Sequence, residues 1–210
     1  MIAPTRLLPA ALGPLLAFCL AVPAVAEVPA ARWDHRPEAG AWTRATLAAI
    51  RGRGDRLVQT EPADIATFCP AYPEAEDADR RAFWVGLFSA LAKHESTWNP
   101  RAAGEGGKYR GLMQIAPGTA RAYGCDAGAL YDGASNLSCA VKIASRQVAR
   151  TGLVAGGPGA WGGLAADWGP MRNLSKLADI AAWTRDQDYC KLDSPKDVAP
   201  KPYGSPEYSG

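Results

Sequence analysis

The chain has 210 residues, of which 48% are hydrophobic, and 23 Lys and Arg stand against 21 Asp and Glu, for a formal net charge of +2. A charge so close to balance gives no electrostatic reason to expect binding to nucleic acid or to an anionic membrane surface. The length suits a single globular domain with a sizeable hydrophobic core.

The first 26 residues have the pattern of a secretory signal peptide. Arg6 is their only charge, residues 7–22 form an uncharged apolar run, and Ala24-Val25-Ala26 is a small-x-small cleavage site. We predict cleavage before Glu27 and export, most simply to the periplasm. No other segment is apolar and long enough to span a bilayer, so no membrane anchor is predicted.

Export removes Cys19 with the leader and leaves four cysteines in a compartment that permits disulfides. Four cysteines allow three pairings, and the sequence alone does not decide between them. We favour Cys125–Cys139 and Cys69–Cys190. The competing interpretation is zinc, but the chain has no Cys-x-x-Cys and only two histidines, so we expect no metal and no cofactor.

Residues 80–99 predict a helix on which the rest of the domain is organised. At 100° per residue Trp84, Phe88, Leu91 and Glu95 share a narrow arc, so the carboxylate continues an apolar stripe. Burial there raises the pKa of a carboxyl and suits it to donate a proton. The alternative is that Glu95, at the helix end, turns out to water.

The remaining elements predict a mainly helical chain with few strand signals. Residues 27–76 are an N-terminal extension packed on the domain, with a short helix over 41–50. Residues 77–190 form the domain. After the helix over 80–99, we predict a loop or hairpin at 101–110, a helix at 117–123, and a helix that runs to Val148 from a cap at Ser135 or Asn136. A loop at 152–163 then leads to a last helix at 174–186, capped by Asn173. Residues 191–210 are rich in proline and predict a disordered tail.

Three motifs together resemble the catalytic domain of soluble lytic transglycosylases, a family related in fold to goose-type lysozyme. They are Glu95-Ser96 followed by Asn99-Pro100, then Gly111-Leu112-Met113-Gln114-Ile115, then Asn136-Leu137 opening a helix. The similarity covers residues 80–150. It implies a lysozyme-like, mainly helical single domain, here stapled by disulfides.

The resemblance implies that Glu95 is the single catalytic acid and base. It would protonate the glycosidic oxygen between N-acetylmuramic acid and N-acetylglucosamine of peptidoglycan, and the muramic C6 hydroxyl would then attack C1 to give a 1,6-anhydro sugar. The expected partner is the peptidoglycan strand, and the expected state a monomer; a cell-envelope assembly is a further partner that the resemblance leaves open.

The resemblance also implies that Ser96, Met113, Gln114 and Asn136 bind substrate. Each has a plainer alternative: a local turn bond for Ser96, core packing for Met113, backbone capping for Gln114 and a helix cap for Asn136. His94 falls about 100° round the helix from Glu95. We therefore expect it to be at the surface or half-buried and to take no part in a proton relay.

One departure from the family is the missing Ala-Tyr-Asn-x-Gly element. In its place stand Trp161 and Trp168, which we propose as surfaces on which a sugar ring stacks, although a tryptophan is more often part of a core. Two other functions therefore stay open, a lysozyme-like hydrolase and a cell-wall binding protein without turnover. For the hydrolase, the carboxylates available as a second catalytic group are Glu105, Asp126, Asp132 and Asp167.

Overall fold

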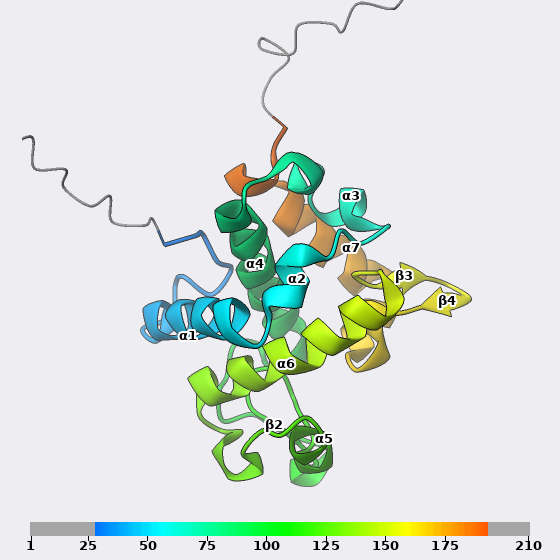
Figure 1. The fold of residues 1–210 in the computed structure, drawn as a ribbon. Coiled ribbons are helices and arrows are strands. Elements are labelled where there is room, and N and C mark those ends of the chain that lie inside the picture. The colour runs from blue at the N-terminus through cyan, green and yellow to red at the C-terminus, as the bar shows by residue number, and fades with distance from the viewer. Residues whose placement is uncertain (1–27, 193–210) are drawn as a thin grey trace, which may run out of the picture.

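The computed structural model describes residues 28–192, so the predicted signal peptide and nearly all of the proline-rich tail lie outside the described part. The helices are α1 (Ala39–Gly52), α2 (Asp55–Gln59), α3 (Ile65–Phe68), α4 (Asp77–Ser96), α5 (Pro117–Ala122), α6 (Gly133–Thr151) and α7 (Leu174–Arg185). The four strands form two short antiparallel hairpins, β1 (Ala103–Gly104) with β2 (Tyr109–Arg110) and β3 (Gly156–Gly157) with β4 (Ala160–Trp161). The fold is mainly helical, as predicted (Figure 1).

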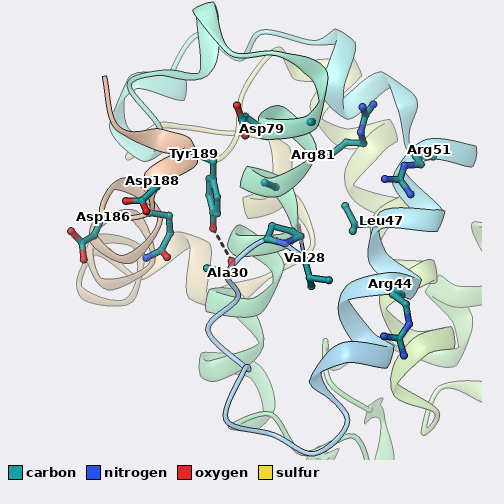
Figure 2. A pocket seen from close by; sticks show the side chains of 14 residues that line it. Val28, Ala30, Arg44, Leu47, Arg51, Asp79, Arg81, Asp186, Asp188 and Tyr189 are labelled. Atoms are coloured by element: carbon teal, nitrogen blue, oxygen red, sulfur yellow. Dashed lines mark hydrogen bonds between the residues drawn. The ribbon is translucent and has the colours of Figure 1, made fainter. Parts of the chain in front are cut away.

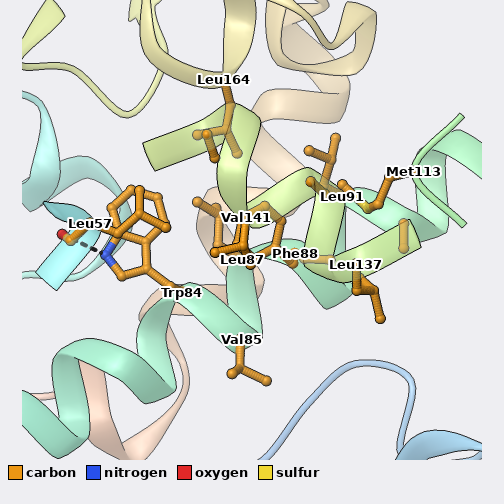
Figure 3. Packing of buried hydrophobic residues seen from close by; sticks show 14 of the residues in the cluster. Leu57, Trp84, Val85, Leu87, Phe88, Leu91, Met113, Leu137, Val141 and Leu164 are labelled. Atoms are coloured by element: carbon orange, nitrogen blue, oxygen red, sulfur yellow. Dashed lines mark hydrogen bonds between the residues drawn. The ribbon is translucent and has the colours of Figure 1, made fainter. Parts of the chain in front are cut away.

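Helix α4 is the central element of the core. Every residue from Ala82 to Ala92 is buried, so the helix is covered on all sides and the apolar stripe predicted from the sequence is only part of its buried surface. Figure 3 shows Val85 pointing to one side of α4 while Leu91 points to another. A helix that is apolar all round belongs in the interior of a domain.

The N-terminal segment shares this core. Helix α1 packs against α6 and α4, and its Trp42 and Ile50 join the same cluster of buried side chains as Trp84 of α4. Gly133, the first residue of α6, allows the approach, since a Cβ there would lie 2.3 Å from Trp42 Nε1. Residues 28–76 are therefore packed on the rest of the domain by a common hydrophobic interior.

Two predictions made from the sequence are corrected. The segment 152–163, predicted as loop, contains the β3–β4 hairpin. Helix α6 begins at Gly133, and its cap is Asp132, whose Oδ1 accepts a hydrogen bond from Ser135 N at 2.8 Å, in place of Ser135 or Asn136. An aspartate before a glycine is a common turn and is an equally good cap, so the pattern alone did not separate them.

Both predicted disulfides are present. Cys69 joins Cys190 across 121 residues, and Cys125 joins Cys139 across 14. The first ties the residue after α3 to the turn that follows α7. In residues 28–192 no cluster of three His, Cys, Asp or Glu side chains could hold a metal ion. Over the same residues, none of the helices has the length and hydropathy that crossing a bilayer requires.

Candidate active site

A groove of about 380 Å³ opens at the C-terminal end of α4. Its lining comes from the β1–β2 hairpin, from the turn that follows it and from the segment 167–172, which contains the 3-10 turn η5 (Gly169–Arg172). The residues that line it are Glu95, Gly104, Glu105, Tyr109, Gln114, Asp167, Trp168, Gly169, Pro170 and Arg172.

Glu95 contributes a carboxyl that is suited to donate a proton. Burial raises its pKa from 4.5 to about 7, and the positive charge of Lys176 acts in the opposite direction. Among the described residues none makes a hydrogen bond to this carboxyl. Near neutral pH a large share of Glu95 is therefore protonated, with its acid proton available to a ligand in the groove.

The backbone just after Glu95 is held in an unusual conformation. Thr97 and Trp98 have φ values of 51° and 56°, in the left-handed region that residues other than glycine seldom adopt. The Trp98 indole anchors this turn, since its Nε1–H donates to Ser89 O at 2.9 Å and its ring packs edge-on against His35. This anchor holds the turn that follows α4, directly after Glu95-Ser96.

A cluster of charges ties the same end of α4 to α7. Asp179 accepts two hydrogen bonds from Arg32, at 2.6 and 3.0 Å, lies 3.2 Å from Lys93 Nζ and has His94 Nε2 at 2.7 Å. The Arg32 hydrogen bonds, with those of His94 and Lys93, lower the pKa of Asp179. His94 is thus a half-buried structural residue, beside Glu95 in sequence but bonded away from it.

The turn at Gly111–Gln114 brings Gln114 into the lining of the groove that holds Glu95. Gly111 has φ +76° and a Cβ there would lie 2.1 Å from Leu130 O, so glycine is required on both counts. Gln114 also has a positive φ, 44°, and its side-chain amide donates to Gly111 O at 2.8 Å and Ala102 O at 3.2 Å. Gln114 therefore lines the groove while it braces the backbone.

Asn136 and Met113 are placed differently from what the resemblance implies. Asn136 is fully buried, and its Nδ2 donates to Arg110 O and Leu130 O while its Oδ1 accepts from Met113 N, each at 2.9 Å. Met113 is fully buried in the core. Neither side chain is among those that line the groove, since that of Asn136 holds the turn that carries Gln114 and that of Met113 packs in the core.

Of Ser96 and the two proposed tryptophans, the structure brings only Trp168 to the groove. The Ser96 hydroxyl donates to Ala92 O at 3.3 Å, which is a local helix bond, and Ser96 is not among the lining residues. Trp161 lies in the β3–β4 hairpin and is not among them either. Trp168 lines the groove, but only 3% of the residue is exposed and its Nε1–H donates to Met113 O at 2.9 Å, which leaves little of its surface for a sugar ring.

The four carboxylates considered as a second catalytic group fall into two pairs. Asp126 and Asp132 cap helical turns, accepting from Gly128 N and Ser135 N. Glu105 and Asp167 line the same groove as Glu95. From the sequence alone the four are equivalent, because capping by an aspartate is recognised only once the helix start is known.

Four side chains around this site are not predicted from the sequence. They are Trp98, Arg172, Lys176 and Asp179, which come to it from the turn after α4, from η5 and from α7. Trp98 lies within the predicted helix 80–99 and has no motif of its own, and the other three lie in a segment without a motif. The neighbouring Asn173, which caps α7 by accepting from Lys176 N at 3.1 Å, was the only signal there.

A larger cavity, of about 670 Å³, lies near the other end of α4. Figure 2 shows Arg44, Arg51 and Arg81 on one side of it and Asp186 and Asp188 on the other. Its lining residues on α4 are Ala78, Asp79, Arg81 and Ala82, at least 13 residues before Glu95, which along a helix is about 20 Å. This cavity is therefore separate from the groove that holds Glu95.

Comparison with known proteins finds a matching family and similar solved structures. The family model described as the transglycosylase SLT domain matches residues 73–157. Solved structures of the protein DslA are similar over 79% of this chain and 100% of theirs: a glutamate-to-glutamine variant with 30% identity and a TM-score of 0.72, and a wild-type form with 30% identity and a TM-score of 0.71. A second DslA variant, also with a glutamate replaced by glutamine, has a TM-score of 0.71. No curated protein matches the chain.

Proposed function

The chain belongs to the transglycosylase SLT domain family, whose members are peptidoglycan lytic transglycosylases, and we propose that it cleaves the β-1,4 bond between N-acetylmuramic acid and N-acetylglucosamine with Glu95 as its only catalytic carboxyl. The observation that carries the proposal is the raised pKa of Glu95, about 7, in a groove lined by the motif residue Gln114. The proposal needs no cofactor.

In the proposed reaction one carboxyl serves both half-reactions. Glu95 gives its proton to the glycosidic oxygen as the bond from that oxygen to C1 of the muramic sugar breaks. The resulting carboxylate then takes the proton of the C6 hydroxyl while the C6 oxygen bonds to C1. Glu95 ends protonated again and no water is consumed, so a carboxyl whose pKa lies near the working pH can serve in both directions.

The test is digestion of purified sacculi by the wild type and by Glu95→Gln, followed by mass spectrometry of the released muropeptides. Glutamine has nearly the same shape but has no acidic proton to give, so we expect at least a thousandfold loss of release with the fold retained. An anhydro product is lighter than a reducing muramic end by the mass of one water. Undiminished release by Glu95→Gln contradicts the proposal.

The alternative enzyme is a hydrolase of the same bond. It is favoured by the presence of Glu105 and Asp167 in the groove, either of which can orient a water toward C1. Glu105→Gln and Asp167→Asn therefore serve as matched variants beside Glu95→Gln. A reducing muramic product, together with a large loss of rate in one of these two variants, would identify hydrolysis and the second carboxyl.

The alternative outside catalysis is a peptidoglycan-binding protein that has kept the groove and lost turnover. The missing Tyr-Asn element favours this alternative. The raised pKa of Glu95, which suits a proton donor, is evidence against it. Co-sedimentation with sacculi without release of any muropeptide, by the wild type at pH 5 to 7, would establish binding alone.

We also propose that the protein is exported and acts in the periplasm as a monomer. The two disulfides and a cell-wall substrate both suit an oxidising compartment outside the cytoplasm. Recovery of the protein from the periplasmic fraction with Glu27 as its first residue is the expected result. Full-length chain in the cytoplasm would contradict it.

A further inference from the structure

Two cations lie where η5 leads into α7. Arg172 lines the groove together with Glu95, and Lys176 follows four residues later in the first turn of α7. Both side chains are exposed. The charge of Lys176 lowers the pKa of Glu95, so the segment from Arg172 to Lys176 presents positive charge to the proposed acid.

Neither cation is neutralised by the described part of the protein. No carboxylate of residues 28–192 lies within 4.0 Å of Arg172 or Lys176, whereas Asp179, on the same helix as Lys176, is occupied by Arg32, Lys93 and His94. The carboxylate of Asp167 shares the groove with Arg172, but it accepts a hydrogen bond from Gln147 at 2.6 Å.

The guanidinium of Arg172 is oriented by the backbone. Its Nη1 donates to Ala165 O and to Ala166 O, the latter at 3.4 Å, and its Nε and Nη2 have no acceptor among the described residues. A guanidinium held in this way keeps donors free at little further cost in side-chain entropy. The ammonium of Lys176, four residues further on, is a second exposed donor.

We propose that Arg172 and Lys176 form a subsite for a carboxylate on the lactyl-peptide branch of the muramic sugar bound beside Glu95. This inference rests on the proposed function, because it takes the glycan strand as the ligand. The branch offers a carboxylate in either of two forms: on the stem peptide when the peptide is present, or on the lactyl group itself when the peptide has been removed. A charge-assisted hydrogen bond to either form selects muramic-containing strands over an uncharged glycan.

The test measures binding, so that it does not depend on turnover. Lys176→Met is made in the Glu95→Gln protein, which removes the titration of Glu95 as a route by which Lys176 can act. Titration calorimetry uses three ligands: peptide-bearing strands, strands stripped by an amidase to expose the lactyl carboxylate, and an N-acetylglucosamine oligomer with no carboxylate. Lys176→Arg is the conservative variant, and Arg185→Gln, at the other end of α7, is the matched loss of one charge.

We expect Lys176→Met to weaken binding of one carboxylate-bearing strand by about tenfold, the usual scale for a charged hydrogen bond, and to leave the oligomer unchanged. A loss confined to peptide-bearing strands assigns the stem peptide, and a loss confined to stripped strands assigns the lactyl group. Lys176→Arg should retain binding and Arg185→Gln should have no effect. Equal affinity of Lys176→Met and its parent for all three ligands, or an equal loss for all three, overturns the subsite. If no strand binds even the parent, it is the proposed function that fails.

Discussion

Glu95 is governed by two opposing influences, and they decide the pH range in which it can act. Burial raises its pKa to about 7 and Lys176 lowers it. A general acid must be protonated, so we expect kcat/KM to fall as the pH rises through about 7. Removing the ammonium in Lys176→Met should raise the pKa of Glu95 further and move the fall to higher pH.

The measurement is a pH profile of muropeptide release from sacculi for the wild type, Lys176→Met and the control Arg185→Gln. Arg185 lies at the far end of α7, so Arg185→Gln removes one positive charge, as Lys176→Met does, but at a place remote from the first turn of that helix. A shift of the profile to lower pH in Lys176→Met, or an equal shift in both variants, would contradict a direct action of Lys176 on the acid.

The buried carboxyl also has a predictable effect on stability. Because the pKa of Glu95 is about 7 when folded and near its ordinary 4.5 when unfolded, the unfolded chain releases this proton first as the pH rises. The contribution of Glu95 to stability is thus fully present below about pH 4.5 and is lost as the pH rises through about 7, by up to about 3 kcal/mol. Glu95→Gln has no such titration.

We therefore expect Glu95→Gln to raise the thermal midpoint relative to the wild type at pH 8 and to change it little at pH 4.5. Thermal unfolding of the two proteins, followed by circular dichroism at both pH values, tests this, since all other titrations cancel in the comparison. A lower midpoint for Glu95→Gln at pH 8 would mean that the ionised carboxylate stabilises the folded state.

At the scale of the elements, the end of α4 is held against α7 and the N-terminal segment through Asp179. Its pKa is lowered by hydrogen bonds from Arg32, His94 and Lys93, so its stabilising contribution is present above the unfolded pKa and is lost as the pH falls through the lower folded value. The Asp179 side chain is 37% exposed, and solvent screening keeps the effect small.

Asp179→Asn should accordingly lower the free energy of unfolding by about 1 kcal/mol at pH 7 and by much less near pH 2. Urea unfolding at the two pH values measures the difference. The matched control is Asp186→Asn, an acid at the end of α7 that lies 4.0 Å from Lys191 in an exposed pair. An equal loss in both variants would show that Asp179 is only another surface charge.

The helices were predictable from the sequence where one signal sets each boundary. Asn173 marks the start of α7, and Pro117 the start of α5, because a cap or a proline fixes the first turn locally. Boundaries with rival signals were not predictable: Asp132, Ser135 and Asn136 are all good caps, and the choice depends on the burial of Asn136 against a distant turn.

The site was predictable only in its centre. Glu95 was recognised by its position on an apolar arc and by the motif around it. The side chains that hold or flank it come from other elements, as Trp98, Arg172 and Asp179 do, and sequence spacing carries no information on which elements meet. For Met113 and Asn136, which are buried and do not line the groove, the motif carries no information on whether a side chain lines a groove or packs beneath it.

The whole molecule is organised so that one buried helix presents an acid at its end while the chain on either side is closed around it. The N-terminal segment, α6 and α7 all contribute to the core that covers α4. Gly86 marks how close this packing is, since a Cβ there would lie 2.1 Å from the Tyr189 hydroxyl, which in turn donates to Ala30 O at 3.1 Å. Both ends of the described chain thus meet on α4.

The two disulfides should stabilise this arrangement unequally. In the chain-entropy model a cross-link contributes more when it closes a longer loop, about 5 kcal/mol for the 121 residues between Cys69 and Cys190 and about 3 kcal/mol for the 14 between Cys125 and Cys139. The double variant Cys69→Ser/Cys190→Ser should therefore unfold at a lower urea concentration than Cys125→Ser/Cys139→Ser.

Urea unfolding of the two double variants and of the oxidised wild type gives both differences under one condition. Each variant is the control for the other, because each removes one disulfide and adds two hydroxyls. Both cysteines of the 69–190 pair are at most 2% exposed, as is Cys139, whereas Cys125 is half-buried. Burying the serine hydroxyls therefore costs more stability at the 69–190 pair, and this cost adds to the larger loss expected from the longer loop. A smaller loss for the 69–190 variant would contradict the chain-entropy argument. It would show that packing alone holds the two described ends on α4, and that the unfolded chain is already so compact that the long cross-link restricts it little.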